Sequence, residues 1–188
     1  VELRLVDEAR REREHAQTLL SHPLVGGVDV GLHLRDGDVG VAQWAAGAGA
    51  SSKLFPYAYS IDDLPNGLRL VTVPTDYPNM VAAYTVVRAG SRDEVEPGKS
   101  GYAHLFEHLM FRGSEHYTPE QRDALLKRAG ADSNASTNQD RTTYYVVFSN
   151  EDLEDVLNAE ADRFQRLKYT EPAYKTESLA VLGEYNKN

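Results

Sequence analysis

The sequence contains no cysteine. This absence excludes disulfide bonds, thiolate nucleophiles and zinc sites built on cysteine, and it leaves the redox compartment of the protein undetermined. Positive charge is also scarce, because 20 lysines and arginines stand against 29 aspartates and glutamates, for a net charge of −9. Since basic residues form no cluster either, we expect no nucleic-acid partner.

Long hydrophobic runs are missing as well. No apolar stretch approaches the roughly 18 residues that cross a bilayer, so we expect no membrane span. The 188 residues are 41% hydrophobic and 26% charged, which is typical of a soluble globular domain with a core of its own. The chain begins at Val1 without an initiator methionine or a signal peptide, and we therefore interpret it as a trimmed chain or a fragment.

The first part of the chain differs in composition from the rest. Residues 1–20 are mostly charged and compatible with a surface helix, whereas residues 21–53 are rich in glycine and alanine and end like a linker. We therefore predict an N-terminal extension or linker over residues 1–53, without an assigned function, followed by one domain over residues 54–188.

This second part alternates between strand and helix patterns. β-Branched and apolar runs predict four strands, over residues 68–73, 80–90, 132–137 and 141–149. Amphipathic runs with capping signals predict four helices, over residues 100–111, 118–129, 151–167 and from 171 to the C-terminus. This order predicts an α+β fold in which helices pack on one face of a mainly antiparallel mixed sheet.

The stretch from Ser100 to Phe111 places titratable groups in an otherwise apolar helix. On an α-helix His104 and His108 lie one turn apart on the same side, and Glu107 flanks that side. Two imidazoles at this spacing can chelate one zinc ion, while the adjacent carboxylate acts as general base toward water; the order His-x-x-Glu-His is that of the inverted zinc-protease motif. Because burying three polar groups among apolar ones is costly unless a partner compensates, we predict a zinc site.

A hydrolytic zinc site needs a third protein ligand and an open position. Without cysteine, this ligand has to be a histidine, an aspartate or a glutamate from elsewhere in the chain. Glu177 and Glu184 lie two turns apart on one stripe of the last predicted helix, and Glu160 lies on an apolar stripe of the helix before it. The periodicity leaves all three candidates open.

At this point the residues match a family of known proteins. The segments "GYAHLFEHLMFRGSEHY", "RAGADSNASTNQDRTTYY", "LEDVLNAEADRF" and "ESLAVLGEY" together resemble the pitrilysin/insulinase family of zinc metallopeptidases, which includes the mitochondrial processing peptidases. The resemblance covers about residues 57–188 and implies a processing-peptidase-like metallohydrolase domain, of which this chain is the N-terminal part, incomplete at its C-terminus.

The resemblance implies a role for each candidate. His104, His108 and Glu184 match the ligands of one zinc ion, with Glu184 lying 76 residues after His108. Glu107 matches the catalytic general base, which takes a proton from water and passes it to the leaving amine. Glu177 matches a second catalytic-site glutamate, which supports the metal ligands or balances charge. Glu160 is left as structural.

The resemblance also implies how substrate binds. In this family the peptide lies as an added strand on a sheet edge, and such main-chain pairing tolerates many sequences. The matching residues here are Asn134, Ala135, Ser136 and Thr137. Family members close two homologous halves around the peptide, so we expect a second homologous domain or subunit as partner, and we expect the isolated fragment to lack full activity.

The leading hypothesis is a zinc-dependent endopeptidase of peptides or of unfolded and targeting segments. The alternative is a non-catalytic partner or scaffold subunit of the same family, but such subunits typically lose motif residues that are intact here. A lyase with the same inverted motif, such as S-ribosylhomocysteine lyase, uses a cysteine ligand, which this chain lacks. The sequence does not determine the compartment; among the locations of relatives we favour the periplasm or another extracytoplasmic space.

Overall fold

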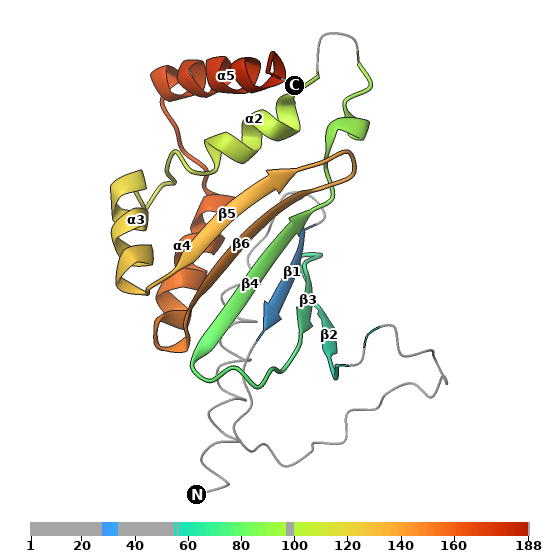
Figure 1. Cartoon of the computed structure of the whole chain (residues 1–188), viewed down its shortest axis with the longest axis vertical. Coiled ribbons are helices and arrows are strands. Elements are labelled where there is room, and N and C mark those ends of the chain that lie inside the picture. The colour runs from blue at the N-terminus through green and yellow to red at the C-terminus, as the bar shows by residue number, and fades with distance from the viewer. Residues whose placement is uncertain (1–27, 34–54, 56, 97–99, 188) are drawn as a thin grey trace, which may run out of the picture.

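The computed structural model describes residues 28–33, 55, 57–96 and 100–187 (Figure 1). Within these ranges six strands form one sheet with the order β2-β3-β1-β4-β6-β5. They are β1 (Val28–His33), β2 (Ser60–Asp63), β3 (Arg69–Thr72), β4 (Met80–Val87), β5 (Asp132–Thr137) and β6 (Thr142–Ser149). Only β1 and β3 pair in parallel, so the predicted mainly antiparallel mixed sheet is confirmed.

Helices complete this part of the chain, and their positions agree with the predicted ones. They are the 3-10 turns η1 (Ser91–Asp93) and η2 (Asn150–Asp152) and the α-helices α2 (Tyr102–Leu109), α3 (Pro119–Arg128), α4 (Leu153–Gln165) and α5 (Glu171–Tyr185). The capping box at α3 forms: the Thr118 hydroxyl accepts from the Gln121 amide at 3.3 Å, and the Gln121 side chain accepts from the Thr118 amide at 2.8 Å. The α+β class is therefore confirmed.

The core lies between the sheet and helices α3 and α4. Every second residue of β6 is buried, because side chains alternate between the two faces of a strand. Val146 and Phe148 of β6 pack in one cluster with Leu126 of α3 and with Val156 and Leu157 of α4. Helices α2 and α5 contact each other, and α2 also contacts the edge strand β5, so both lie at one end of the sheet (Figure 1).

Three short elements escaped the sequence reasoning. Strand β1 comes from the stretch assigned to the extension, and it lies between β3 and β4 in the sheet. Strand β2 and the turn η1 were not predicted either. The domain boundary at residue 54 stays a prediction, and the surface helix predicted over residues 1–20 lies outside the described residues. Among those described, no helix is long and apolar enough to cross a bilayer.

Candidate metal centre

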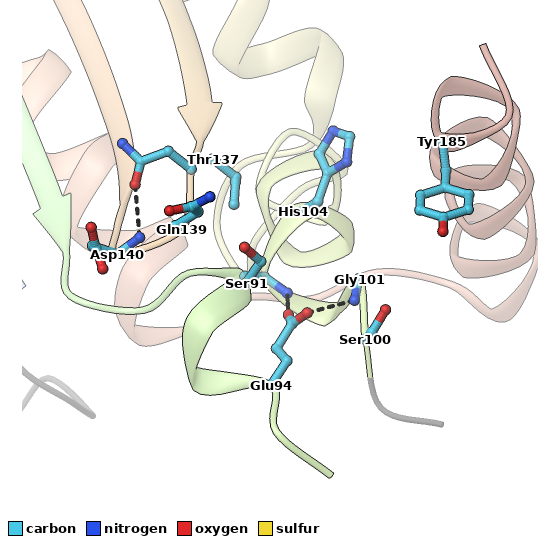
Figure 2. A pocket seen from close by; sticks show the side chains of 11 residues that line it. Ser91, Glu94, Ser100, Gly101, His104, Thr137, Gln139, Asp140 and Tyr185 are labelled. Atoms are coloured by element: carbon cyan, nitrogen blue, oxygen red, sulfur yellow. Dashed lines mark hydrogen bonds between the residues drawn. The ribbon is translucent and has the colours of Figure 1, made fainter. Parts of the chain in front are cut away.

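Helix α2 is held in place at both its start and its buried side. Its first amides are capped from a distance: the two carboxylate oxygens of Glu94 accept hydrogen bonds from the backbone amides of Gly101 and Ala103, each at 2.5 Å (Figure 2). Leu105 and Leu109 are the buried residues of the helix. The remaining sides of α2 therefore carry the polar residues of the motif.

Two histidines from α2 and one glutamate from α5 bring three ligand atoms together. The Nε2 atoms of His104 and His108 lie 3.2 Å apart. One carboxylate oxygen of Glu184 lies 3.2 Å from Nε2 of His104, and the other lies 3.8 Å from Nε2 of His108. Atoms that bind zinc tetrahedrally at about 2.0–2.1 Å lie about 3.3 Å from one another. The two Glu184 distances are measured from different oxygens of its carboxylate; one ligand atom from each of the three residues lies within 4.8 Å of the other two. This grouping and the two-nitrogen, one-oxygen donor set fit a single zinc ion.

Glu177 orients one of these histidines. Its oxygen Oε2 lies 2.8 Å from Nδ1 of His108, and since an ionised carboxylate only accepts hydrogen bonds, this contact favours the His108 tautomer with its proton on Nδ1 and with Nε2 available to a metal. Its other oxygen lies 2.5 Å from the guanidinium group of Arg112. Glu177 is the one buried residue of α5, at 3% exposure, and it is committed to these two partners rather than to the ligand cluster.

Glu107 points toward the sheet edge. Its oxygen Oε2 accepts a hydrogen bond from the hydroxyl of Thr137, the last residue of β5. Its other oxygen, Oε1, accepts no hydrogen bond from the residues that the structure describes. The charge of Glu107 also reaches Tyr144 on β6: burial raises the pKa of this phenol well above its usual range, the Arg163 cation opposes that rise, and the Glu107 carboxylate adds to it.

Among the described residues, Glu160 is not in the group that could hold a metal ion together with the two histidines. It accepts from the guanidinium groups of Arg122 at 2.9 Å and Arg163 at 3.0 Å, and all three residues are buried. Burial acts to raise the pKa of Glu160, but the charges of Arg163 and Arg122 outweigh it and hold that pKa below its usual value. The Arg163 guanidinium also lies 4.9 Å from the centre of the Tyr144 ring. Glu160 thus belongs to a buried ionic cluster, in agreement with a structural role.

The strand matched to substrate binding is an edge strand of the described sheet. Asn134 and Ser136 are exposed, whereas Ala135 and Thr137 are partly buried on the face that the core covers. The side-chain oxygen of Asn134 accepts from the amide of Ala135 at 2.9 Å, so an added peptide strand has to compete with it for this amide. A role of these four residues in binding substrate stays a prediction.

A pocket of about 620 Å³ adjoins the ligand cluster. It is lined by η1, the first turn of α2, the turn between β5 and β6, and Tyr185 at the end of α5 (Figure 2). His104 and Thr137 both line it, so it opens between a candidate metal ligand and the residue that holds Glu107.

The comparison with known proteins defines the class first. The sequence model of the family described as Insulinase (Peptidase family M16) matches residues 69–188, and the chain belongs to this family. It is 36% identical over 122 residues to "Zinc protease PqqE" of Helicobacter pylori, an alignment that covers 64% of this chain and 27% of that protein. It is 30% identical over 124 residues to "Probable mitochondrial-processing peptidase subunit beta, mitochondrial" of Arabidopsis thaliana, covering 66% of this chain and 23% of that one.

A solved structure agrees with these relatives. The crystal structure of a protease from Helicobacter pylori matches 68% of this chain and 30% of its own with a TM-score of 0.64 at 34% identity. The resemblance stated from the sequence motifs is thereby confirmed, as is the fold. The chain spans less than a third of the length of each of these three proteins.

Two supporting residues were missed by the sequence reasoning. Arg112 lies just beyond the end of α2, where it pairs with Glu177, and helical spacing from His108 does not extend to it. Glu94 lies in a loop before α2, and no periodic pattern links it to the amides that it caps.

Proposed function

We propose that this chain forms the metal-binding part of a zinc-dependent endopeptidase that cleaves peptides or unfolded and targeting segments. The proposal is carried by the ligand atoms of His104, His108 and Glu184, one from each residue, which all lie within 4.8 Å of one another, with Glu107 next to His108 on the same helix. Zinc held there would supply a Lewis acid toward a peptide carbonyl and would lower the pKa of water. Membership of a peptidase family supports the same reaction class.

Each residue of the site then has a task. Glu177 keeps His108 in the tautomer whose Nε2 is free to bind metal. Glu107 takes a proton from the attacking water on Oε1, the oxygen that Thr137 leaves unbonded, and passes it to the leaving amine. The edge of β5 offers main-chain groups to an extended peptide, which would be oriented by pairing rather than by its sequence.

A second homologous domain or subunit would complete the enzyme. The chain spans less than a third of its relatives, and the relative from Arabidopsis thaliana is named as a subunit. The ligand cluster is also open, because the Glu184 side chain is 48% exposed and that of His104 is 35% exposed. A partner that covers this side would enclose the peptide and exclude water from the reacting groups.

The variant Glu107→Gln in the full-length protein tests this function. We expect zinc content, measured by elemental analysis, to stay at the wild-type level, and cleavage of an unstructured peptide to fall about 100-fold or more. Glu151→Gln removes an exposed carboxylate in η2 and serves as the matched control. Cleavage by Glu107→Gln at the wild-type rate would refute the base role. A wild-type protein without zinc and without cleavage would instead support the non-catalytic partner subunit.

A further inference from the structure

We propose that Thr137 is a positioning residue for Glu107: its hydroxyl anchors one carboxylate oxygen and reserves the other for proton transfer. This inference rests on the proposed peptidase function. In this inference the Thr137 side chain binds another side chain of the same protein, Glu107, whereas the sequence resemblance assigned Thr137 to substrate binding.

The hydroxyl of Thr137 lies in a short chain of hydrogen bonds. It donates to Oε2 of Glu107 on α2. On its other side it lies 3.2 Å from the hydroxyl of Thr142, which is directly opposite in the pairing of β5 with β6. Thr142 is buried, and its hydroxyl lies 3.0 Å from the carbonyl oxygen of Ala89. This series of hydrogen bonds therefore links helix α2 to strands β5 and β6 of the sheet.

The available protons decide the direction of these bonds. Each threonine hydroxyl has one proton, and both the Glu107 carboxylate and the Ala89 carbonyl can only accept. The proton of Thr142 is directed to Ala89 or to Thr137, but in both arrangements the proton of Thr137 is directed to Glu107. The Thr137 hydroxyl is thus already committed, and it has no second proton to donate to a substrate carbonyl.

Anchoring matters because Glu107 is a flexible, partly buried side chain. A glutamate has three side-chain torsions, and ordering it against a helix costs conformational entropy. A hydrogen bond to a charged acceptor is stronger than one between neutral groups, so Thr137 can hold Oε2 in one place. Because Oε2 of Glu107 accepts the hydrogen bond from Thr137, Oε1 is the oxygen that takes the proton, and it has no partner among the described residues.

The test compares Thr137→Val, which keeps the shape and removes the hydroxyl, with Thr137→Ser, which keeps the hydroxyl. Thr143→Val is the control, because Thr143 is the next residue of β6 after Thr142 and points to the opposite face of the strand. For Thr137→Val we expect kcat for peptide cleavage to fall about 10- to 100-fold with KM and zinc content unchanged, and for Thr137→Ser we expect at least about one third of wild-type kcat. Thr143→Val should behave as wild type.

Two kinetic results would overturn the inference. One is a Thr137→Val enzyme whose kcat equals that of a wild type that depends on zinc and on Glu107. The other is a rise in KM at constant kcat, which would assign Thr137 to substrate binding.

A structural readout keeps the inference separate from the peptidase proposal. In crystal structures of the metal-free proteins, Glu107 should adopt the wild-type conformation in Thr137→Ser and leave it in Thr137→Val. An unchanged Glu107 in Thr137→Val would refute the positioning role even if the protein cleaves no peptide. If wild type fails to cleave while Glu107 moves in Thr137→Val, the peptidase proposal fails and the anchoring by Thr137 stands.

Discussion

Glu177 contacts His108, and removing the negative charge of Glu177 should lower the metal affinity of the site by a definite amount. In Glu177→Gln the side chain keeps its size and one acceptor oxygen, but it loses the negative charge that strengthens the 2.8 Å bond to Nδ1. A hydrogen bond to a charged group contributes about 1.5–3 kcal/mol, roughly twice a neutral one. The substitution should therefore cost about 1–1.5 kcal/mol, or about tenfold in zinc affinity.

Competition with a zinc-binding indicator dye at fixed pH measures this change. Arg112→Gln is a second variant for comparison. It removes the partner of the other Glu177 oxygen and leaves the Glu177–His108 contact in place, so it should weaken zinc binding less than Glu177→Gln does. Affinity equal to wild type in Glu177→Gln would refute the orienting role. A loss of about 1,000-fold or more would show that Glu177 is itself a metal ligand, which also contradicts the account.

Three further predictions, on two variants, concern the framework of the site. Glu160→Gln leaves two buried guanidinium groups without their anion, so the free energy of unfolding in urea should fall by about 3–5 kcal/mol, and a loss below about 1 kcal/mol would contradict this. The pKa of Glu160 in the folded protein is below its usual value of 4.5, so its contribution to stability is complete above that pH and is lost as the pH falls through the folded value; Glu160→Gln should flatten this part of an acid-unfolding curve. Glu94→Ala removes the cap of α2 and should cost about 1 kcal/mol, seen as a lower melting temperature; an unchanged melting temperature would show that the cap contributes nothing.

Local sequence rules were sufficient for the helix that carries the two histidines. His104 and His108 are four residues apart, and helical geometry alone brings them to one side, as observed. The third candidate ligand is different, because contacts between α2 and α5 depend on how the whole chain folds. Helical periodicity did not distinguish between Glu160, Glu177 and Glu184 as the third candidate ligand. Only the family resemblance selected Glu184, which the structure places next to both histidines.

The elements that escaped prediction have weak or distant signals. The segment of β1 contains glycine and sits in a glycine- and alanine-rich stretch, which reads as a linker, and its parallel partner β3 lies well beyond it in the chain. The bond from Thr137 to Glu107 joins residues 30 positions apart on a strand and a helix, so no periodic pattern could indicate it. Side-chain bonds between elements were therefore the part of the site that the sequence left unpredicted.

The zinc stoichiometry of wild type and of Glu184→Gln tests the central claim most directly. Isothermal titration of the metal-free full-length protein should give one zinc per site in wild type and binding weakened at least about 100-fold in Glu184→Gln, because two imidazoles alone make an incomplete site. Glu171→Gln, at the exposed start of the same helix, is the control and should bind as wild type does. A wild-type protein that takes up no zinc, or a Glu184→Gln variant that binds it equally tightly, would contradict the account.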